Sequence, residues 1–343
     1  MKLLTGCILT FLIINTTFAQ DPHFSQYEAT PLIVNPANAG LKHDLRAVVN
    51  YRNQWGAVAS PYKTTAFSFD MRTDQGGTNN AYFGIGGQLL HDKSGDANMA
   101  LLQGTLNLAG IIKLDNYSKL SLGLMGGFGQ RSVDYDQFRW ESQYQNGAYN
   151  AQVSSNELLL TPTFSYFDVG AGIAWTYGKD QAYITANDGV KATVGFSASH
   201  FGLPAASFFG ADEALKTKFI GHATMELGKA NTNLTFIPSV YYVQQGKQRE
   251  ILLGNTFRYL LQEGSHFTGF KKSSSIGLGV HYRLLDALIT SFQLDYSNYT
   301  LGVSYDVNLS QLSTASNMRG GIELFLRFVT PNPFSKGSIS KFR

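Results

Sequence analysis

Apolar and polar residues alternate with a period of two along most of the chain. In residues 301–309 the odd positions are Leu, Val, Tyr, Val and Leu, while the even positions are Gly, Ser, Asp and Asn. The same alternation runs through residues 45–52, 67–72 and 322–328. Because successive side chains of a strand point to opposite faces of a sheet, this pattern predicts strands with one apolar and one polar face.

The alternating segments are numerous and are separated by turn residues, for example at 74–77, 93–96, 115–116 and 187–189. No segment after the first 20 residues reaches the roughly 18 to 20 apolar residues of a membrane helix, and none keeps a 3.6-residue period over a long stretch. The chain is therefore predicted to be essentially all β. We count fourteen predicted strands, centred near residues 49, 67, 85, 106, 124, 172, 196, 222, 238, 254, 280, 292, 304 and 323.

Periodicity alone does not separate a soluble sandwich from a barrel in lipid. Strands of about ten residues or more, an even number of strands, and aromatic residues near strand ends such as Tyr51 and Tyr282 favour the barrel. Isolated charges in mid-strand lie on the polar face, where an aqueous or hydrogen-bonded lumen accommodates them. We predict a transmembrane antiparallel β-barrel of about 14 strands over residues 42–330, in a bacterial outer membrane.

The N-terminus resembles an export signal. Lys2 precedes the mostly apolar residues 3–18, and residues 17–19 end in a small-x-small pattern. These features predict a signal peptide over residues 1–19, cleaved between Ala19 and Gln20. Cys7 lies inside the apolar run rather than at its end, so it is not expected to become a lipidated N-terminus.

Composition excludes several kinds of chemistry. Cys7 is the single cysteine, so the mature chain has no disulfide, no thiolate nucleophile and no cysteine metal ligand. Without Lys2, the 27 Lys and Arg residues become 26 against 24 Asp and Glu. That near balance, with no basic block, makes nucleic acid an unexpected partner.

No local signature of catalysis is present. Residues 195–199 and 302–306 begin like a nucleophile elbow, but they lack the closing glycine and lie in predicted strands. The closest two of the seven histidines, His266 and His281, are fifteen positions apart, which is not a metal-ligand spacing. We expect no enzyme, no cofactor and no metal site, and an outer-membrane hydrolase is the weakest of three hypotheses.

Charges of both signs occur on the polar face of the first two and last four predicted strands, which barrel closure brings side by side. We interpret them as a cross-lumen ion-pair network that fills or narrows the barrel; the alternative is a substrate path. In the last strand, Arg at Leu324 or Leu326 should block assembly, whereas Phe325, facing the lumen, should be more tolerant. The proposed network contains Arg46, Arg52, Asp70, Arg72, Arg283, Asp306, Glu323 and Arg327.

The longest connection, residues 134–165, faces outside if both termini are periplasmic. It is rich in aromatic and amide residues, including Tyr135, Phe138 and Trp140. One interpretation is an ordinary loop folded over the mouth; the other is a docking surface, since rigid aromatic residues anchor interfaces. Two further connections, near 179–188 and 262–272, are longer than periplasmic turns usually are.

Several motifs together resemble the PorP/SprF family of outer-membrane proteins. They are DPHFSQY at 21–27, NPANAG at 35–40, NYRNQW at 50–55, GLGVHYR at 277–283 and GVSYD at 302–306. Their order covers both ends of the mature chain. The family's last strand often carries a Ser-His-Glu step, whereas this chain has Gly-Gly-Ile before Glu323, and a tail at 331–343 follows the last predicted strand.

The resemblance implies a non-enzymatic role associated with type IX secretion and gliding motility. Members of the family are thought to help secrete or anchor large surface adhesins that carry a C-terminal sorting domain, and to contact periplasmic secretion components. Outer-membrane lipid would surround the barrel. The runner-up hypothesis from another class is a porin-like diffusion channel.

Residues 20–41 precede the first alternating segment. They contain three prolines and cannot form a regular strand, so we expect them at or inside the periplasmic mouth, either as a leader into the first strand or as a partner-binding segment. Deletion of residues 24–38 is expected to spare membrane insertion, because these residues contribute no ladder of their own. The candidate partner-binding residues are Asp21, Pro22, Phe24, Gln26, Tyr27, Asn35 and Pro36.

Overall fold

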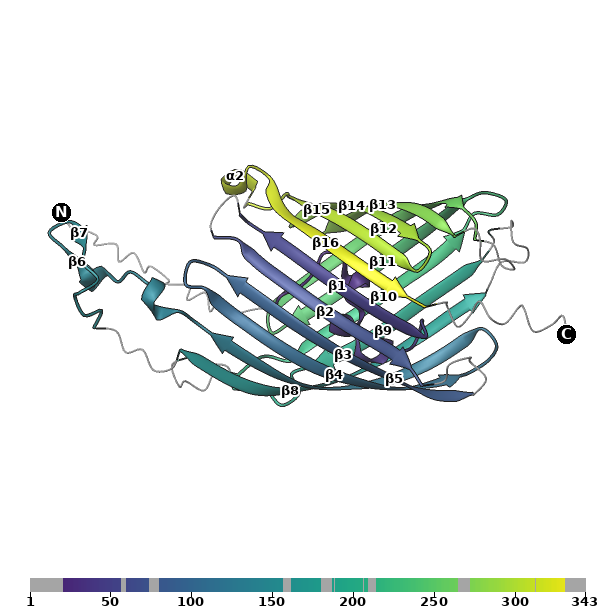
Figure 1. Ribbon diagram of the computed structural model, residues 1–343, viewed down its shortest axis with the longest axis horizontal. Helices are drawn as coiled ribbons and strands as arrows, with labels where there is room; N and C mark the ends of the chain where they lie inside the picture. The colour runs from purple at the N-terminus through teal and green to yellow at the C-terminus, as the bar shows by residue number, and fades with distance from the viewer. Residues whose placement is uncertain are drawn as a thin grey trace, which may run out of the picture.

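Fourteen strands form one closed barrel (Figure 1), which confirms the predicted fold and strand count. The computed structural model describes residues 21–56, 60–73, 80–156, 162–179, 187, 189–205, 207–208, 214–264, 272–311 and 313–330. The predicted signal peptide (1–19), the turn at 74–77 and the tail (331–343) lie outside these residues. The barrel strands are β1 (Leu45–Gln54), β2 (Tyr62–Arg72), β3 (Ala81–Ser94), β4 (Met99–Lys113), β5 (Ser118–Ser132), β8 (Thr163–Lys179), β9 (Val190–Ser199), β10 (Lys218–Gly228), β11 (Leu234–Gln245), β12 (Gln248–Gln262), β13 (Ser274–Arg283), β14 (Ala287–Tyr296), β15 (Tyr299–Asn308) and β16 (Arg319–Val329).

Each barrel strand pairs antiparallel with its neighbours along the chain, and β1 pairs with β16 to close the sheet. The closing register places Arg46 opposite Val329 and Gln54 opposite Gly321. Closure pairs the backbone groups that an open sheet would leave exposed at its edges, and a strand cannot cross hydrocarbon without such pairing.

The outer face of the barrel is apolar and exposed. Leu106 is 71% exposed, Leu124 67% and Leu122 58%. The opposite, inward positions of the same strands are polar and buried, as with Asn107 and Ser121. This inversion of a soluble protein's pattern is what a barrel surrounded by lipid requires.

The two ends of the barrel differ. The connections at 133–162 and 200–217 lie at the end where β1 finishes, which we call the outer mouth, because long loops of such barrels face the cell exterior. β1 begins and β16 ends at the opposite, inner mouth. The two long inner connections predicted near 179–188 and 262–272 are retained at 180–189 and 263–273, although most of their residues lie outside the described part of the chain.

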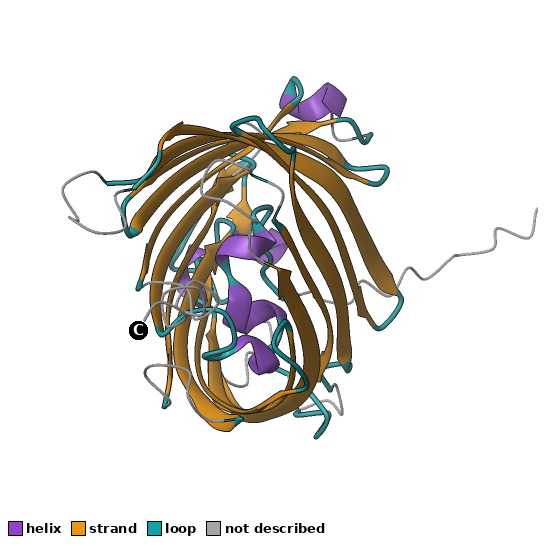
Figure 2. Ribbon diagram, turned by 90° about the vertical axis from the view of Figure 1, so that its right-hand side faces the viewer, coloured by secondary structure: helices purple, strands orange, loops and turns teal. Residues whose placement is uncertain are grey.

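Residues 21–44, which we call the plug, lie inside the barrel (Figure 2). The plug contains three short helices, η1 (Tyr27–Ala29), α1 (Pro31–Val34) and η2 (Pro36–Asn38). In the described part of the chain, no helix is long and apolar enough to span a membrane. The plug starts among outer-mouth residues and ends beside the inner ends of β2 and β3, so it traverses the lumen. The sequence predicts this segment at or inside the periplasmic mouth, whereas in the structure it extends through the lumen to the outer mouth.

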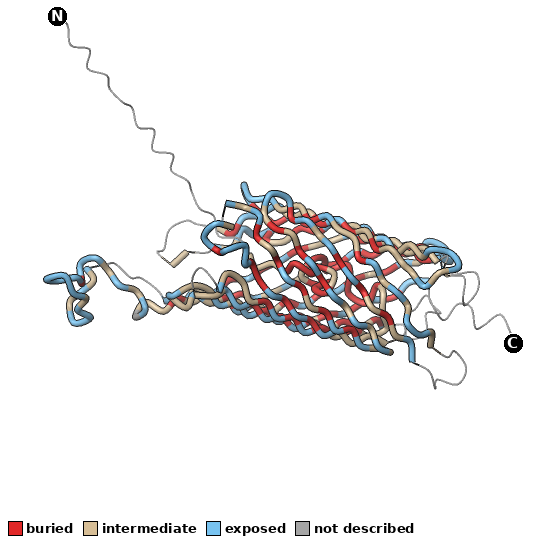
Figure 3. The backbone as a smooth tube through the Cα atoms, turned by 90° about the horizontal axis from the view of Figure 1, so that it is seen from above, coloured by how far each residue is buried: buried red, intermediate tan, exposed pale blue. Residues whose placement is uncertain are grey.

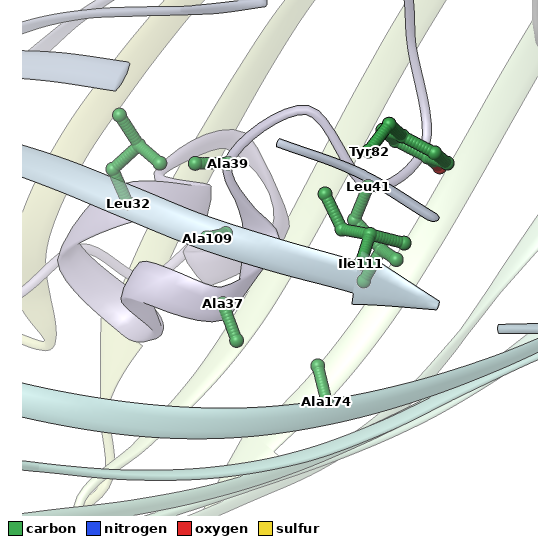
Figure 4. Packing of buried hydrophobic residues seen from close by; sticks show 8 residues of the cluster. All are labelled: Leu32, Ala37, Ala39, Leu41, Tyr82, Ala109, Ile111 and Ala174. Atoms are coloured by element: carbon green, nitrogen blue, oxygen red, sulfur yellow. The ribbon is translucent and has the colours of Figure 1, made fainter. Parts of the chain in front are cut away.

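The buried core of the protein lies between the plug and the barrel wall, and Figure 3 shows the buried residues concentrated within the barrel. In one cluster, Leu32, Ala37 and Leu41 of the plug pack against inward-facing side chains of β3, β4 and β8 (Figure 4). Gly84 and Gly123 are needed here, because a Cβ at either would collide with the backbone of the plug. The plug is therefore fitted closely to this wall.

Candidate functional site

The outer half of the plug is bound by two buried carboxylates of the barrel. Glu323 on β16 accepts hydrogen bonds from the backbone N–H groups of Ser25 (2.8 Å) and Gln26 (3.0 Å). Asp306 on β15 accepts one from the hydroxyl of Ser25 at 2.7 Å. Both carboxylates are at most 3% exposed, so their oxygen atoms accept hydrogen bonds from the plug rather than from water in an open lumen.

Two arginines complete this cluster. Arg52 lies 3.1 Å from Asp306 and donates to the carbonyl of His23 at 2.6 Å. Arg283 donates to the hydroxyl of Ser25 at 2.7 Å and lies 3.3 Å from Asp306. Removing one partner of such a buried pair leaves the other charge uncompensated. Four residues predicted for the lumen network meet here: Arg52, Arg283, Asp306 and Glu323.

A second group binds the inner half of the plug. Arg46 and Asp70 form two parallel hydrogen bonds of 2.8 and 3.1 Å. Arg46 also donates to the carbonyl of Asn38 at 3.1 Å, and Asp70 accepts from the backbone of Gly40 at 2.9 Å. The pair thus binds both a carbonyl group and an N–H group of the plug backbone.

The remaining two predicted network residues lie near the inner mouth. Arg72 is fully buried and forms an ion pair with Asp44 of the plug at 2.7 Å. Arg327 lies 3.9 Å from Asp295 on β14. The predicted charges therefore face the lumen in separate groups rather than one network, and most of them bind the plug.

A third anchor, which we call the clasp, was not predicted from the sequence. Asp21 lies 2.7 Å from Nε2 of His200, whose Nδ1 lies 2.9 Å from Asp168 on β8. Lys218 and Arg131 each approach Asp21 to 3.5 Å. Burial alone would raise the pKa of Asp21, but these three basic groups outweigh it and hold that pKa well below its usual range. The clasp fixes the start of the plug at the outer mouth.

The clasp should open at alkaline pH. Burial would lower the pKa of His200, but hydrogen bonds to Asp168 and Asp21 overcome this and raise the pKa to about 9. A raised pKa contributes stability that is complete below the ordinary value of 6.5 and is lost as the pH rises through about 9. We expect a fluorophore on Pro22→Cys to report release of the plug terminus across that range. Persistence of the same transition in a His200→Gln control would contradict this assignment.

The centre of the plug is held by Asn35. Its side-chain amide donates to the carbonyls of Ile173 (3.0 Å) and Phe196 (3.3 Å), while its oxygen accepts from the backbone of Ala37 at 2.9 Å. A Cβ at Gly172 would occupy the position of this amide. Asn35 therefore connects the bend before η2 to the strands β8 and β9.

The structure places the plug residues predicted to bind a partner inside the barrel. Phe24 packs in a buried cluster with residues of β2, β3, β4 and β8, and Tyr27 stacks on Tyr241 with ring centroids 4.7 Å apart. Pro22 lines the outer cavity described below. Partner binding by this segment remains a prediction, and it would require access through one of the two mouths. The buried members of the set are Phe24, Gln26, Tyr27, Asn35 and Pro36.

The plug lines two cavities of the described lumen, one toward each mouth. The outer cavity, of about 550 Å³, is lined by polar residues together with Trp55, Tyr62 and Leu101. The inner cavity, of about 330 Å³, is mainly polar and is lined by charged residues of both signs, including Lys42 and Glu226. Neither of these two cavities is lined by residues of both mouths.

Residues 133–156, which we call the arm, project from the outer mouth (Figures 1 and 3). This corrects the interpretation of a loop folded over the mouth. Ring contacts join Phe138 to Tyr135 at 6.0 Å and to Trp140 at 5.3 Å. The arm also contains the short 3-10 helices η3 (Tyr135–Gln137) and η4 (Glu141–Gln143) and the hairpin strands β6 (Tyr144–Gln145) and β7 (Ala148–Tyr149).

Local hydrogen bonds give the arm a defined conformation. The side chain of Gln143 accepts from the backbone of Trp140 at 3.1 Å and donates to the carbonyl of Val153 at 3.0 Å. Asn146 and Gly147 form the hairpin turn with positive φ angles of 53° and 81°, a conformation that Asn-Gly favours. The arm therefore presents its aromatic residues on an ordered support.

The sequences that resembled catalytic motifs have structural roles. The hydroxyl of Ser197 donates to the carbonyl of Val34 at 2.6 Å and so binds the plug. Within the described residues, no group of three or more His, Cys, Asp or Glu side chains is arranged to hold a metal ion.

The closed strand order, the apolar exterior and the plugged polar lumen define an outer-membrane β-barrel. The chain belongs to the type IX secretion system membrane protein PorP/SprF family, whose model matches residues 16–328. No curated protein matches the sequence significantly.

Solved structures with a similar barrel include the toluene transporter TbuX of Ralstonia pickettii, with 11% identity over 88% of this chain and 92% of that one, at a TM-score of 0.46. A FadL homologue of Pseudomonas aeruginosa shares 10% identity over 86% and 92%, at 0.44. CdiB from Acinetobacter baumannii shares 8% over 84% of this chain at 0.39, and the chain spans 60% of CdiB. Likeness at this level concerns the barrel fold alone.

Proposed function

We propose that this barrel is a non-enzymatic, closed accessory of type IX secretion that helps to secrete a large surface adhesin or to hold it at the cell exterior. The observation that carries the proposal is that the chain's own plug occupies the lumen, while an ordered aromatic arm projects from the outer mouth. A barrel of this kind offers a fixed surface in the membrane rather than a path through it.

Both ends of the molecule have a place in this proposal. The arm and the outer cavity would meet the C-terminal sorting domain of the secreted adhesin, because ordered aromatic residues lose little entropy on binding. The inner mouth, where Lys42 and His43 of the plug line the inner cavity, would face periplasmic secretion components. A link to gliding motility would follow if the adhesin is one that moves along the cell surface.

The alternative hypothesis is a diffusion channel. It would require the plug to leave the lumen, or the two cavities to join, under conditions of transport. Steady conductance through the intact purified barrel would favour this alternative, and the bilayer experiment below measures it.

The arm provides the direct test of partner binding. Combined replacement of Tyr135, Phe138 and Trp140 by Ala is expected to lower surface display of the type IX substrate at least tenfold, because the half-buried aromatic cluster of the arm is lost. The barrel itself should still shift on a gel between unheated and boiled samples. The measurement is surface labelling of the substrate beside that gel-shift assay.

The matched control removes aromatic residues at the other mouth. Tyr296→Ala with Tyr299→Ala deletes two exposed rings near the inner turn and should leave display unchanged. Normal display in the triple arm variant would count against the arm. Normal display in cells that lack the barrel altogether would refute the proposed function.

A further inference from the structure

The outer part of β8 extends beyond its neighbour on one side. β8 has 17 residues and β9 has 10, and their pairing ends where Gly170 lies opposite Ser199. On its other side β8 remains paired with β5 as far as Thr163, opposite Ser132. The segment Thr163–Asp168 is therefore part of the sheet on one side and forms its edge on the other.

The backbone direction at this edge can be assigned. The carbonyl of Val169 accepts from the N–H of Phe201 at 3.3 Å, so Val169 directs its backbone groups to the β9 side. Alternate residues of a strand share this direction, so Thr163, Ser165 and Phe167 direct theirs to the same side. In the described part of the chain, no strand or bridge pairs with them there.

The edge also lacks the features that prevent strand addition. Natural edges are protected by Lys, Pro, bulges or short length, and residues 163–168 contain neither Lys nor Pro and pair with β5 without a bulge. Asp168 does not protect the edge, because it is 1% exposed and points inward to His200. Phe208 contacts the ring of Phe164 at 4.7 Å between centroids, which is a side-chain contact and not a backbone pair.

We propose that the β8 edge at Thr163–Asp168 receives an extended strand of the secreted partner, which adds to the barrel wall by backbone hydrogen bonds. This proposal rests on the proposed function and names how the partner binds. The incoming strand would continue the sheet where β9 stops, and alternate side chains would lie beside Phe167 outside and Tyr166 inside.

The position of the edge favours a secreted polypeptide over other occupants. Unpaired backbone groups are not tolerated in hydrocarbon, and the outward side chains of Thr163 and Ser165 are exposed and polar, so this segment lies above the lipid core. Lipid chains offer no donors or acceptors to an edge. The arm begins directly after Ser132, which pairs with Thr163, so a partner bound to the aromatic residues of the arm would have this edge within reach.

A proline at position 165 tests the proposal. Ser165→Pro removes an N–H group that β5 does not use, and proline is compatible with an edge strand. We expect this variant to insert and to shift on the gel as the wild type does, but to lower substrate display at least tenfold. The matched control, Ser165→Ala, changes the side chain while it keeps the N–H group, and should display the substrate normally.

Two measurements that do not use the proline variant make the test independent of its folding. Amide hydrogen exchange of Ser165 and Phe167 should be fast in the purified barrel; slow exchange would mean that its own chain covers the edge and would overturn the proposal. A photo-crosslinking residue at Thr163 should capture the type IX substrate on cells. Capture of a second barrel alone would overturn it as well.

The outcomes separate this inference from the function on which it rests. Loss of display in cells without the barrel, combined with normal display by an inserted Ser165→Pro variant, would refute strand addition and leave the proposed function standing. Normal display in cells without the barrel would refute both.

Discussion

A barrel from which residues 24–38 have been deleted is expected to pass ions in large, steady steps across a planar bilayer, whereas the intact barrel is expected to stay closed. The plug separates the outer and inner cavities, and its backbone is bound by buried carboxylates of the wall. A barrel of fourteen strands is wider than its own side chains can fill. Without the plug, water would hydrate the charges of the lumen and carry current.

The control for this experiment is a deletion of the same length in the arm. Removing residues 142–156 shortens the chain equally but leaves the plug and its anchors in place, so that barrel should remain closed. Steady conductance of the intact barrel would show that the plug does not seal the lumen. A plug-deleted barrel that stays closed would show that the wall collapses or that other residues fill the space.

The same deletion examines the role of the plug in assembly. The closed sheet pairs its own backbone, so the deleted form is still expected to insert and to shift on a gel. It should nevertheless lose its shift at a lower temperature, because four buried clusters each contain a plug residue. We also expect it to fail in substrate display. Loss of insertion itself would make the plug a requirement for folding.

The strands could be predicted because their signal is local. A period of two, repeated between turn residues, defines each strand and also its inward and outward positions. It placed Asp70, Asp306 and Glu323 on the lumen face, where the structure has them. Closure then follows from the need to pair both outer edges in lipid.

The plug and the clasp could not be predicted because their signals are not local. The plug helices are three or four residues long, too short to give a periodic pattern. Asp21 and His200 are 179 positions apart, and His200 follows the last residue of β9 with a positive φ of 62°. Nothing in the spacing of such residues shows that the chain returns through the barrel. The three prolines of residues 21–40 exclude a regular strand, but they do not indicate burial.

The unpaired edge of β8 could not be predicted from the sequence either. The sequence predicts a strand near residue 172. It does not predict that β9 ends at Ser199 and leaves Thr163–Asp168 without a partner on one side, because a period of two does not define the length of a strand. The arm was recognised as a candidate docking surface from its aromatic residues. Its local conformation depends on hydrogen bonds of Gln143 to Trp140 and Val153, which the residue pattern does not show.

The last strand allows a test of both faces of the barrel wall. Leu324 and Leu326 face outward, as predicted, and Arg at either position should cost about 2 to 4 kcal/mol of folding free energy in lipid. The sequence led us to expect tolerance at Phe325, because it faces the lumen. The structure changes that expectation: Phe325 is 3% exposed and packs with Ala29 of the plug and Val48 of β1.

We therefore expect damage at both faces, but of different kinds. Leu324→Arg should weaken insertion by that amount, because a charge would enter hydrocarbon. Phe325→Ala should insert but lose about 3 to 5 kcal/mol through the cavity left over Gly302, whose Cα its ring covers. Urea unfolding in lipid vesicles, followed by gel shift, measures both, with Leu324→Ile as the conservative control. If Phe325→Ala had no effect in a plug-deleted barrel, the lost stability would come from the contact of Phe325 with the plug. If its effect were undiminished there, the lost stability would come from the contacts of Phe325 with Gly302 and Val48 in the barrel wall.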